Sequence, residues 1–85
     1  MRRIIFDEES FDQYSALEKT LKSKAAKLIK DIQRNGHTGI GHPEQLSGDK
    51  AGYWSRRIDK KNRIVYDITD TEATFYSFGG HYDDK

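Results

Sequence analysis

Three residues in the C-terminal half of the chain carry side chains that together suit cleavage of RNA without a metal ion: Glu44, Arg63 and His81. This reaction needs a base for the 2′-hydroxyl proton, a cation for the charge on the phosphoryl oxygens, and an acid for the leaving 5′-oxygen. A carboxylate, a guanidinium and an imidazole can fill these roles. A sheet of antiparallel strands can bring three such positions onto one face, so a ribonuclease site is one hypothesis.

Each of these residues also has a simpler structural interpretation. Glu44 can be an ordinary loop carboxylate, and Arg63 can be a strand cation that pairs with Asp59 or Asp67. His81 can be an exposed residue near the end of the chain. Residue types alone leave both interpretations open.

Basic residues are concentrated between positions 49 and 63. This segment holds six basic and two acidic residues, whereas residues 64–85 hold five acidic and one basic, and the formal net charge of the whole chain is only +1. A positive segment with interspersed aromatic rings can neutralise phosphates and stack on bases. The segment predicts RNA contacts by Lys50, Tyr53, Trp54, Arg56 and Arg57. The alternative is a solvated, charged strand face.

Metal and disulfide chemistry have little support in the sequence. The chain has no Cys, and His37 and His42 lie in a Gly-rich stretch without carboxylate or Cys partners at ligand spacing. We therefore expect both His residues to be solvated loop residues, and we expect no metal site and no cofactor.

Two helices are predicted after a short first strand at residues 2–7. Apolar residues recur at helical spacing from Phe11 to Leu17, and again from Leu21 to Ile32, with a break expected near Lys19 and Thr20. The Asn35-Gly36 pair is a typical helix end. The two segments predict a helical hairpin.

Beyond a loop at residues 35–43, the apolar period changes to two. Segments 53–58, 63–68 and 73–78 are rich in aromatic and β-branched residues and are joined by short polar connectors. Tyr66, Phe75 and Phe78 are expected in the core. These patterns predict an α+β fold, with the helical hairpin packed on one face of a sheet of four to five mainly antiparallel strands.

The length of 85 residues predicts a single domain covering 1–85. Only three apolar residues follow Met1, Arg2 and Arg3, which is too few for a signal peptide or a membrane span. We therefore expect a cytoplasmic protein that does not contact membranes.

Four short strings occur in a distinctive order: GHPEQL at 41–46, GYWSRRI at 52–58, NRIVY at 62–66, and His81-Tyr82. In this order and spacing the chain resembles the YoeB (Txe) family of toxins, a branch of the RelE/ParE superfamily of toxin–antitoxin systems. The resemblance runs nearly end to end and includes the opening strand.

This resemblance implies a microbial ribonuclease fold and a ribosome-dependent messenger RNA endonuclease that forms a 2′,3′-cyclic phosphate without a metal. By matched position, Glu44 would be the general base, His81 the general acid, and Arg63 the clamp on the phosphate. Arg57 would contact phosphate, and Tyr82 would orient the scissile region, although without the resemblance such a Tyr is more often a core or edge aromatic.

The resemblance also implies partners. These are a YefM-type antitoxin whose disordered C-terminal segment folds over the toxin, the 70S ribosome with its messenger RNA, and a second toxin copy in a homodimer. Promoter DNA would be bound only through the antitoxin complex.

The sequence departs from the family pattern at two positions of the candidate site. Members often carry Lys where this chain has Ser47, so Lys50 is the expected substitute, and Asn62 stands where a His is common. Two alternatives remain: a gyrase poison like the related ParE toxins, which need no ribonuclease residues, and a non-catalytic module that binds RNA or an antitoxin.

Overall fold

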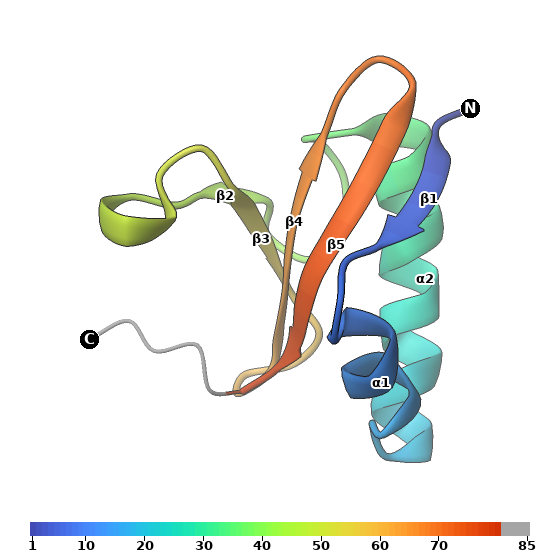
Figure 1. The fold of residues 1–85 in the computed structure, drawn as a ribbon. Coiled ribbons are helices and arrows are strands. Elements are labelled where there is room, and N and C mark those ends of the chain that lie inside the picture. The colour runs from blue at the N-terminus through green and yellow to red at the C-terminus, as the bar shows by residue number, and fades with distance from the viewer. Residues whose placement is uncertain (81–85) are drawn as a thin grey trace.

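Residues 1–80, described by a computed structural model, form a twisted five-stranded sheet with both helices on one face (Figure 1). The α+β class predicted from the sequence is confirmed. The elements in chain order are β1 Arg3–Phe6, α1 Ser10–Ser15, α2 Lys19–Asn35, β2 Glu44–Gln45, a 3₁₀ turn η1 Gly48–Lys50, β3 Trp54–Arg57, β4 Arg63–Ile68 and β5 Glu72–Gly79.

The sheet has the strand order β1-β5-β4-β3-β2. Strands β2 to β5 form the predicted antiparallel meander, and β4 has the predicted bounds. Strand β1 joins the opposite edge by pairing with β5 in parallel, with Ile5 opposite Thr74. The first and last strands are therefore neighbours, with β2 at the other edge.

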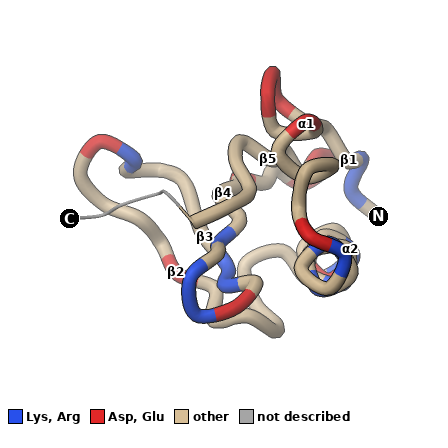
Figure 2. The backbone as a smooth tube through the Cα atoms, turned by 90° about the horizontal axis from the view of Figure 1, so that it is seen from below, with Lys and Arg blue, Asp and Glu red and all other residues tan. Residues whose placement is uncertain are grey.

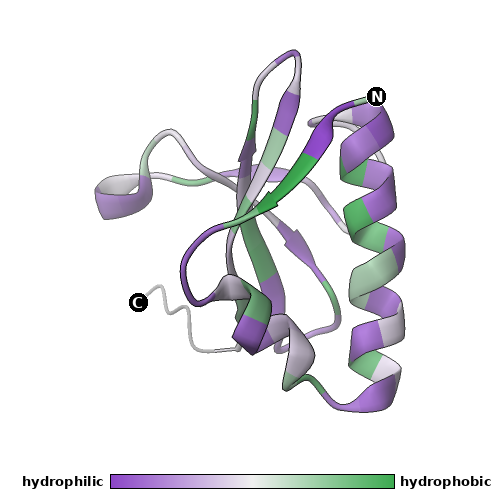
Figure 3. Cartoon of the chain, turned by 45° about the vertical axis from the view of Figure 1, so that its right-hand side comes forward, coloured by the Kyte–Doolittle hydropathy of each residue, from purple (hydrophilic) through white to green (hydrophobic). Residues whose placement is uncertain are grey.

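The core lies between the sheet and α2. Ala25, Leu28, Ile29 and Ile32 of α2 are buried, at the helical spacing seen in the sequence. They face the buried apolar residues of the sheet side, which are Ile58 just after β3, Ile64 and Tyr66 of β4, and Ala73, Phe75 and Phe78 of β5. Figure 3 shows the corresponding hydrophobic segments on β1 and at intervals along α2. The predicted core positions of Tyr66, Phe75 and Phe78 are confirmed.

The two helices form the expected pair, although the first is shorter than predicted. Helix α1 ends at Ser15, and α2 begins at Lys19, where the Glu18 side chain accepts hydrogen bonds from the N–H groups of Thr20 and Leu21. Helix α2 ends at Asn35, and Gly36, with a positive φ of 71°, caps its C-terminus.

The loop from Gly36 to β2 is held by one buried side chain. Arg56 of β3 donates to the backbone oxygens of Gly36, Thr38 and Ile40, and to the Asp31 carboxylate of α2. This loop leads directly into Glu44, so the Arg56 contacts fix where β2 begins.

Within residues 1–80 no helix is long and apolar enough to span a membrane.

Candidate active site

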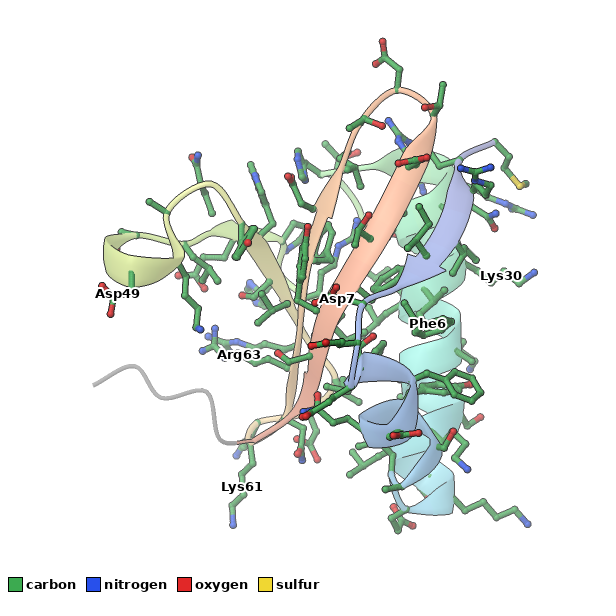
Figure 4. The ribbon with its side chains drawn as sticks, in the orientation of Figure 1. Phe6, Asp7, Lys30, Asp49, Lys61 and Arg63 are labelled. Carbon is green, nitrogen blue, oxygen red and sulfur yellow. The ribbon has the colours of Figure 1, made fainter. Side chains whose placement is uncertain are left out.

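The sheet has one face toward the helices and one face away from them. Side chains alternate between faces along a strand, so the buried residues Ile64 and Tyr66 put Arg63, Val65 and Asp67 of β4 on the opposite face. Figure 4 shows Arg63 extending away from α1 and α2. We call this the open face of the sheet.

Glu44 and Arg63 meet on the open face. Glu44 Oε1 of β2 lies 3.5 Å from Arg63 Nη1 of β4, although β3 separates the two strands. The side chains are 56% and 30% exposed. Neither structural alternative from the sequence applies: Glu44 is in a strand rather than a loop, and Arg63 has its ion pair with Glu44 rather than with Asp59 or Asp67.

Ser55 of β3 lies between these two residues. It is the register partner of both Glu44 and Val65, and it is fully buried. Its Oγ accepts a hydrogen bond of 3.4 Å from Arg63 Nη1. Ser55 was not among the predicted site residues, although alternation with Ile58 in a period-two strand puts it on the face away from the core.

Two further basic residues predicted to contact RNA are exposed. Arg57 is the register partner of Arg63, and both follow the alternation to the open face. Lys50 ends the 3₁₀ turn η1 between β2 and β3. Figure 2 shows basic segments around β2 and β3, with acidic segments among them, and further basic segments on β1 and α2.

The prediction that Arg56 binds RNA is wrong. Its side chain is 0% exposed, and besides the loop contacts its Nε donates to the Tyr66 hydroxyl. The alternation that puts Arg57 on the open face puts Arg56 on the face of Trp54 and Ile58. This signal was present in the sequence.

Asp31 completes the Arg56 site. Burial works against its charge, but hydrogen bonds from Arg56, Asn35 and the N–H of Ile40 lower the pKa of the Asp31 carboxyl overall. Burial likewise raises the pKa of the Tyr66 hydroxyl. This polar group is a structural element on the helix side of the sheet.

Trp54 lies on the helix side of β3 and packs against the core, so it does not share the open face with Glu44 and Arg63. Its ring stacks on His37, with ring centroids 3.8 Å apart and an interplanar angle of 11°. The prediction that Trp54 stacks on RNA therefore needs correction, because His37 covers one face of the indole.

The prediction that His37 is a solvated loop residue is also wrong. Its Nδ1 is buried without a hydrogen-bond partner, and this burial lowers the pKa of the imidazole. His42 is exposed, as predicted. Within residues 1–80 no three His, Asp or Glu side chains gather closely enough to hold a metal ion.

Tyr53 precedes β3 and belongs to the open face by alternation with Trp54. Its N–H donates to the Lys50 carbonyl oxygen and its own carbonyl oxygen accepts from the N–H of Leu46. The remaining predicted residues, His81 and Tyr82, lie outside the described residues.

Known proteins share both the sequence and the fold of this chain. The family of YoeB-like toxins of bacterial type II toxin–antitoxin systems matches residues 6–82. The YoeB toxin of Mycobacterium bovis is 39% identical over 85 residues, covering 96% of this chain and 100% of the relative.

Two solved structures from Staphylococcus aureus agree with the described fold. The YoeB dimer has a TM-score of 0.84 at 36% identity and covers 95% of this chain and 98% of that chain. The YoeB–YefM complex also gives a TM-score of 0.84 at 36% identity, covering 96% and 99%. The chain belongs to the YoeB-like toxins of bacterial type II toxin–antitoxin systems.

Proposed function

We propose that this toxin is a metal-independent endoribonuclease that cleaves messenger RNA at the ribosomal A site and so inhibits translation. The observation that carries the proposal is the meeting of Glu44 and Arg63 on the open face, 3.5 Å apart. A carboxylate beside a guanidinium supplies a base and a phosphate ligand at one place.

In the proposed reaction, Glu44 removes the proton from a ribose 2′-hydroxyl, and the resulting 2′-oxygen attacks the adjacent phosphorus. Arg63 donates hydrogen bonds to the phosphoryl oxygens as negative charge grows on them. The bond from phosphorus to the 5′-oxygen breaks, and His81 gives its proton to that oxygen. The products are a 2′,3′-cyclic phosphate and a 5′-hydroxyl.

Chain connectivity supports His81 as the acid. Arg63 is the register partner of Gly79 at the end of β5, and His81 follows Gly79 by two residues. Two residues of extended chain span about 7 Å. This short separation along the chain is why we assign the acid role to His81, and we assign Tyr82 to orienting the scissile nucleotide.

The exposed ion pair suits a site that must open for its substrate. Both partners are accessible to water, so the pair contributes little to stability and a phosphate can replace the carboxylate as the ligand of Arg63. We assign Arg57 and Lys50 to neighbouring phosphates, since both are exposed basic residues beside β2 and β3.

The test is cleavage of a defined messenger RNA by the purified protein, with and without ribosomes, with the cuts mapped by primer extension. We expect cuts in the A-site codon only with ribosomes. Glu44→Gln, Arg63→Lys and His81→Gln should each lower the rate by about 10²-fold or more. Ribosome binding should persist in all three variants.

Glu72→Gln is the matched control, because Glu72 forms an exposed ion pair with Arg3 at the β1 edge of the sheet, far from β2. It should cleave at the parent rate. An absence of cuts by the parent protein, together with growth arrest in cells, would overturn the nuclease assignment and favour a gyrase poison or a purely binding toxin.

Partners of the relatives suggest partners for this chain. The S. aureus YoeB is found as a dimer and in a complex with YefM. We propose that this chain, as a single domain, also pairs with a YefM-type antitoxin and dimerises. Co-expression with a YefM-type antitoxin gene, followed by size-exclusion chromatography with light scattering, would reveal either assembly.

A further inference from the structure

Two tyrosines stack on each other across the open face. The rings of Tyr53, just before β3, and Tyr76, in β5, have centroids 4.6 Å apart and an interplanar angle of 25°. Strands β3 and β5 are separated by β4, so they are about 10 Å apart. Both rings must therefore reach over β4 to meet, and both remain partly exposed.

The stack has a defined place relative to the Glu44–Arg63 pair. Along β3 the open face carries Tyr53, then Ser55 beside Glu44, then Arg57 beside Arg63. Each step of two residues is about 7 Å. The tyrosines and the arginines thus lie on either side of the Glu44–Ser55 row.

The charge on the open face changes along the same direction. Arg57 and Arg63 are at one end. At the tyrosine end, burial and the neighbouring Tyr53 raise the pKa of the Tyr76 hydroxyl, and the carboxylates of Asp67 and Asp7 add to this effect. The arginine end attracts a phosphate, whereas the tyrosine end offers aromatic rings.

We propose that the Tyr53–Tyr76 stack is a nucleobase-binding subsite that holds a base next to the scissile phosphate. This inference rests on the proposed ribonuclease function and adds to it a polarity: phosphate at the arginine end, base at the tyrosine end. Aromatic side chains bind bases of single-stranded RNA by stacking. Tyr76 had no place in the RNA surface expected from the sequence.

The test compares Tyr76→Leu, which removes the ring, with Tyr76→Phe, which keeps it. In a Glu44→Gln background, binding to short single-stranded RNA is measured by fluorescence anisotropy, and binding to ribosomes programmed with messenger RNA by filter retention. Each RNA is used intact and with one abasic nucleotide, moved along the strand. Phe11→Leu is the matched control, since Phe11 is an aromatic residue of α1 with 52% exposure, on the helix side of the sheet.

Tyr76→Leu should weaken binding of intact RNA about tenfold, whereas Tyr76→Phe and Phe11→Leu should bind like the parent. At one position of the strand, an abasic nucleotide should weaken RNA binding by the parent to a similar extent. For that abasic RNA, Tyr76→Leu should cause no further loss of affinity. That loss of sensitivity separates stacking on a base from a general loss of structure, which would act on every RNA.

Three outcomes would overturn the subsite. If Tyr76→Leu binds all RNAs like the parent while Glu44-dependent cleavage stands, the subsite is wrong and the nuclease function survives. If Tyr76→Leu instead changes the oligomeric state at unchanged RNA affinity, the stack belongs to a protein contact. If the parent neither binds nor cuts RNA, the proposed function fails and the subsite fails with it.

Discussion

Arg56 of β3 and Asp31 of α2 form an ion pair on the helix side of the sheet, with Nη1 and Oδ2 2.5 Å apart. The same guanidinium binds three backbone oxygens of the loop that leads to Glu44. A single buried cation therefore links α2, the loop and the sheet, and it connects the stability of the helix side to the geometry of the open face.

Asp31→Ala should lower the free energy of unfolding by about 3 kcal/mol, because it leaves the buried Arg56 charge without its carboxylate. Urea unfolding at pH 7 followed by circular dichroism measures this difference. Arg3→Ala, which breaks the exposed Arg3–Glu72 pair, should cost less than about 1 kcal/mol. Equal losses in the two variants would contradict a special role for the buried pair.

Gly39→Ala should destabilise the protein by about 1–3 kcal/mol and lower cleavage. A Cβ at Gly39 would lie 1.9 Å from Asp31 Oδ2, at a φ of +132°. Gly79→Ala is the comparison, since Gly79 has a similar φ of +142° but no atom within 4 Å of an added Cβ. Thermal unfolding of both variants separates the two effects, because only Gly39→Ala adds a clash to the backbone strain. Similar midpoints would show that the neighbouring side chain moves and relieves the clash.

His37 should make stability fall as the solution is acidified. Burial lowers its folded pKa below the ordinary value of 6.5, opposed by Asp67 and reinforced by Arg2 and Arg56. From about pH 6.5 down to the lower folded pKa, the unfolded chain binds a proton that the folded chain does not, so unfolding becomes easier.

His37→Phe keeps an aromatic ring for Trp54 and removes this titration, so its free energy of unfolding should drop less than that of the parent between pH 7.5 and 5. Urea titrations at both pH values give the two drops. His42→Asn is the control, because His42 is exposed and has a φ of 55° that Asn tolerates. If the free energy of unfolding of His37→Phe drops as much as that of the parent, groups other than His37 cause the acid sensitivity.

Ser55 should act on cleavage as a positioning residue for Arg63. Ser55→Ala removes the Oγ that accepts from Arg63 Nη1, so we expect kcat to fall about tenfold with KM nearly unchanged. Ser55→Thr keeps the hydroxyl and should restore part of kcat. A parallel rise in KM, or no rescue by Thr, would mean that the substitution disturbs the sheet and not the arginine.

The strands were predictable because their alternation is regular. Strand β4 has its predicted bounds, and alternation around Ile58 and Ile64 assigns each neighbouring side chain to a face. The parallel pairing of β1 with β5 was not predictable, since it joins segments far apart in the sequence and depends on the whole fold.

The site was predictable only in part, because local patterns identify residues but do not define contacts between distant segments. Glu44 and Arg63 were singled out by residue type and by resemblance, but their contact depends on the register of β2, β3 and β4, which no local pattern defines. Arg56 was misassigned because a charged residue is normally solvated, and only several polar partners from a distant loop make its burial favourable. His37 was missed because its neighbour Trp54 lies in a different element.

The parallel pairing of β1 with β5 also determines when this toxin can fold during its own synthesis. Strand β1 is made first but cannot pair until β5 has been made, because β5 is the only strand beside β1 among the described residues. Contacts of such wide sequence separation form late. A nascent chain that stops before β5 lacks the central partner of both β1 and β4. An assembled toxin therefore exists only after β5 has been made.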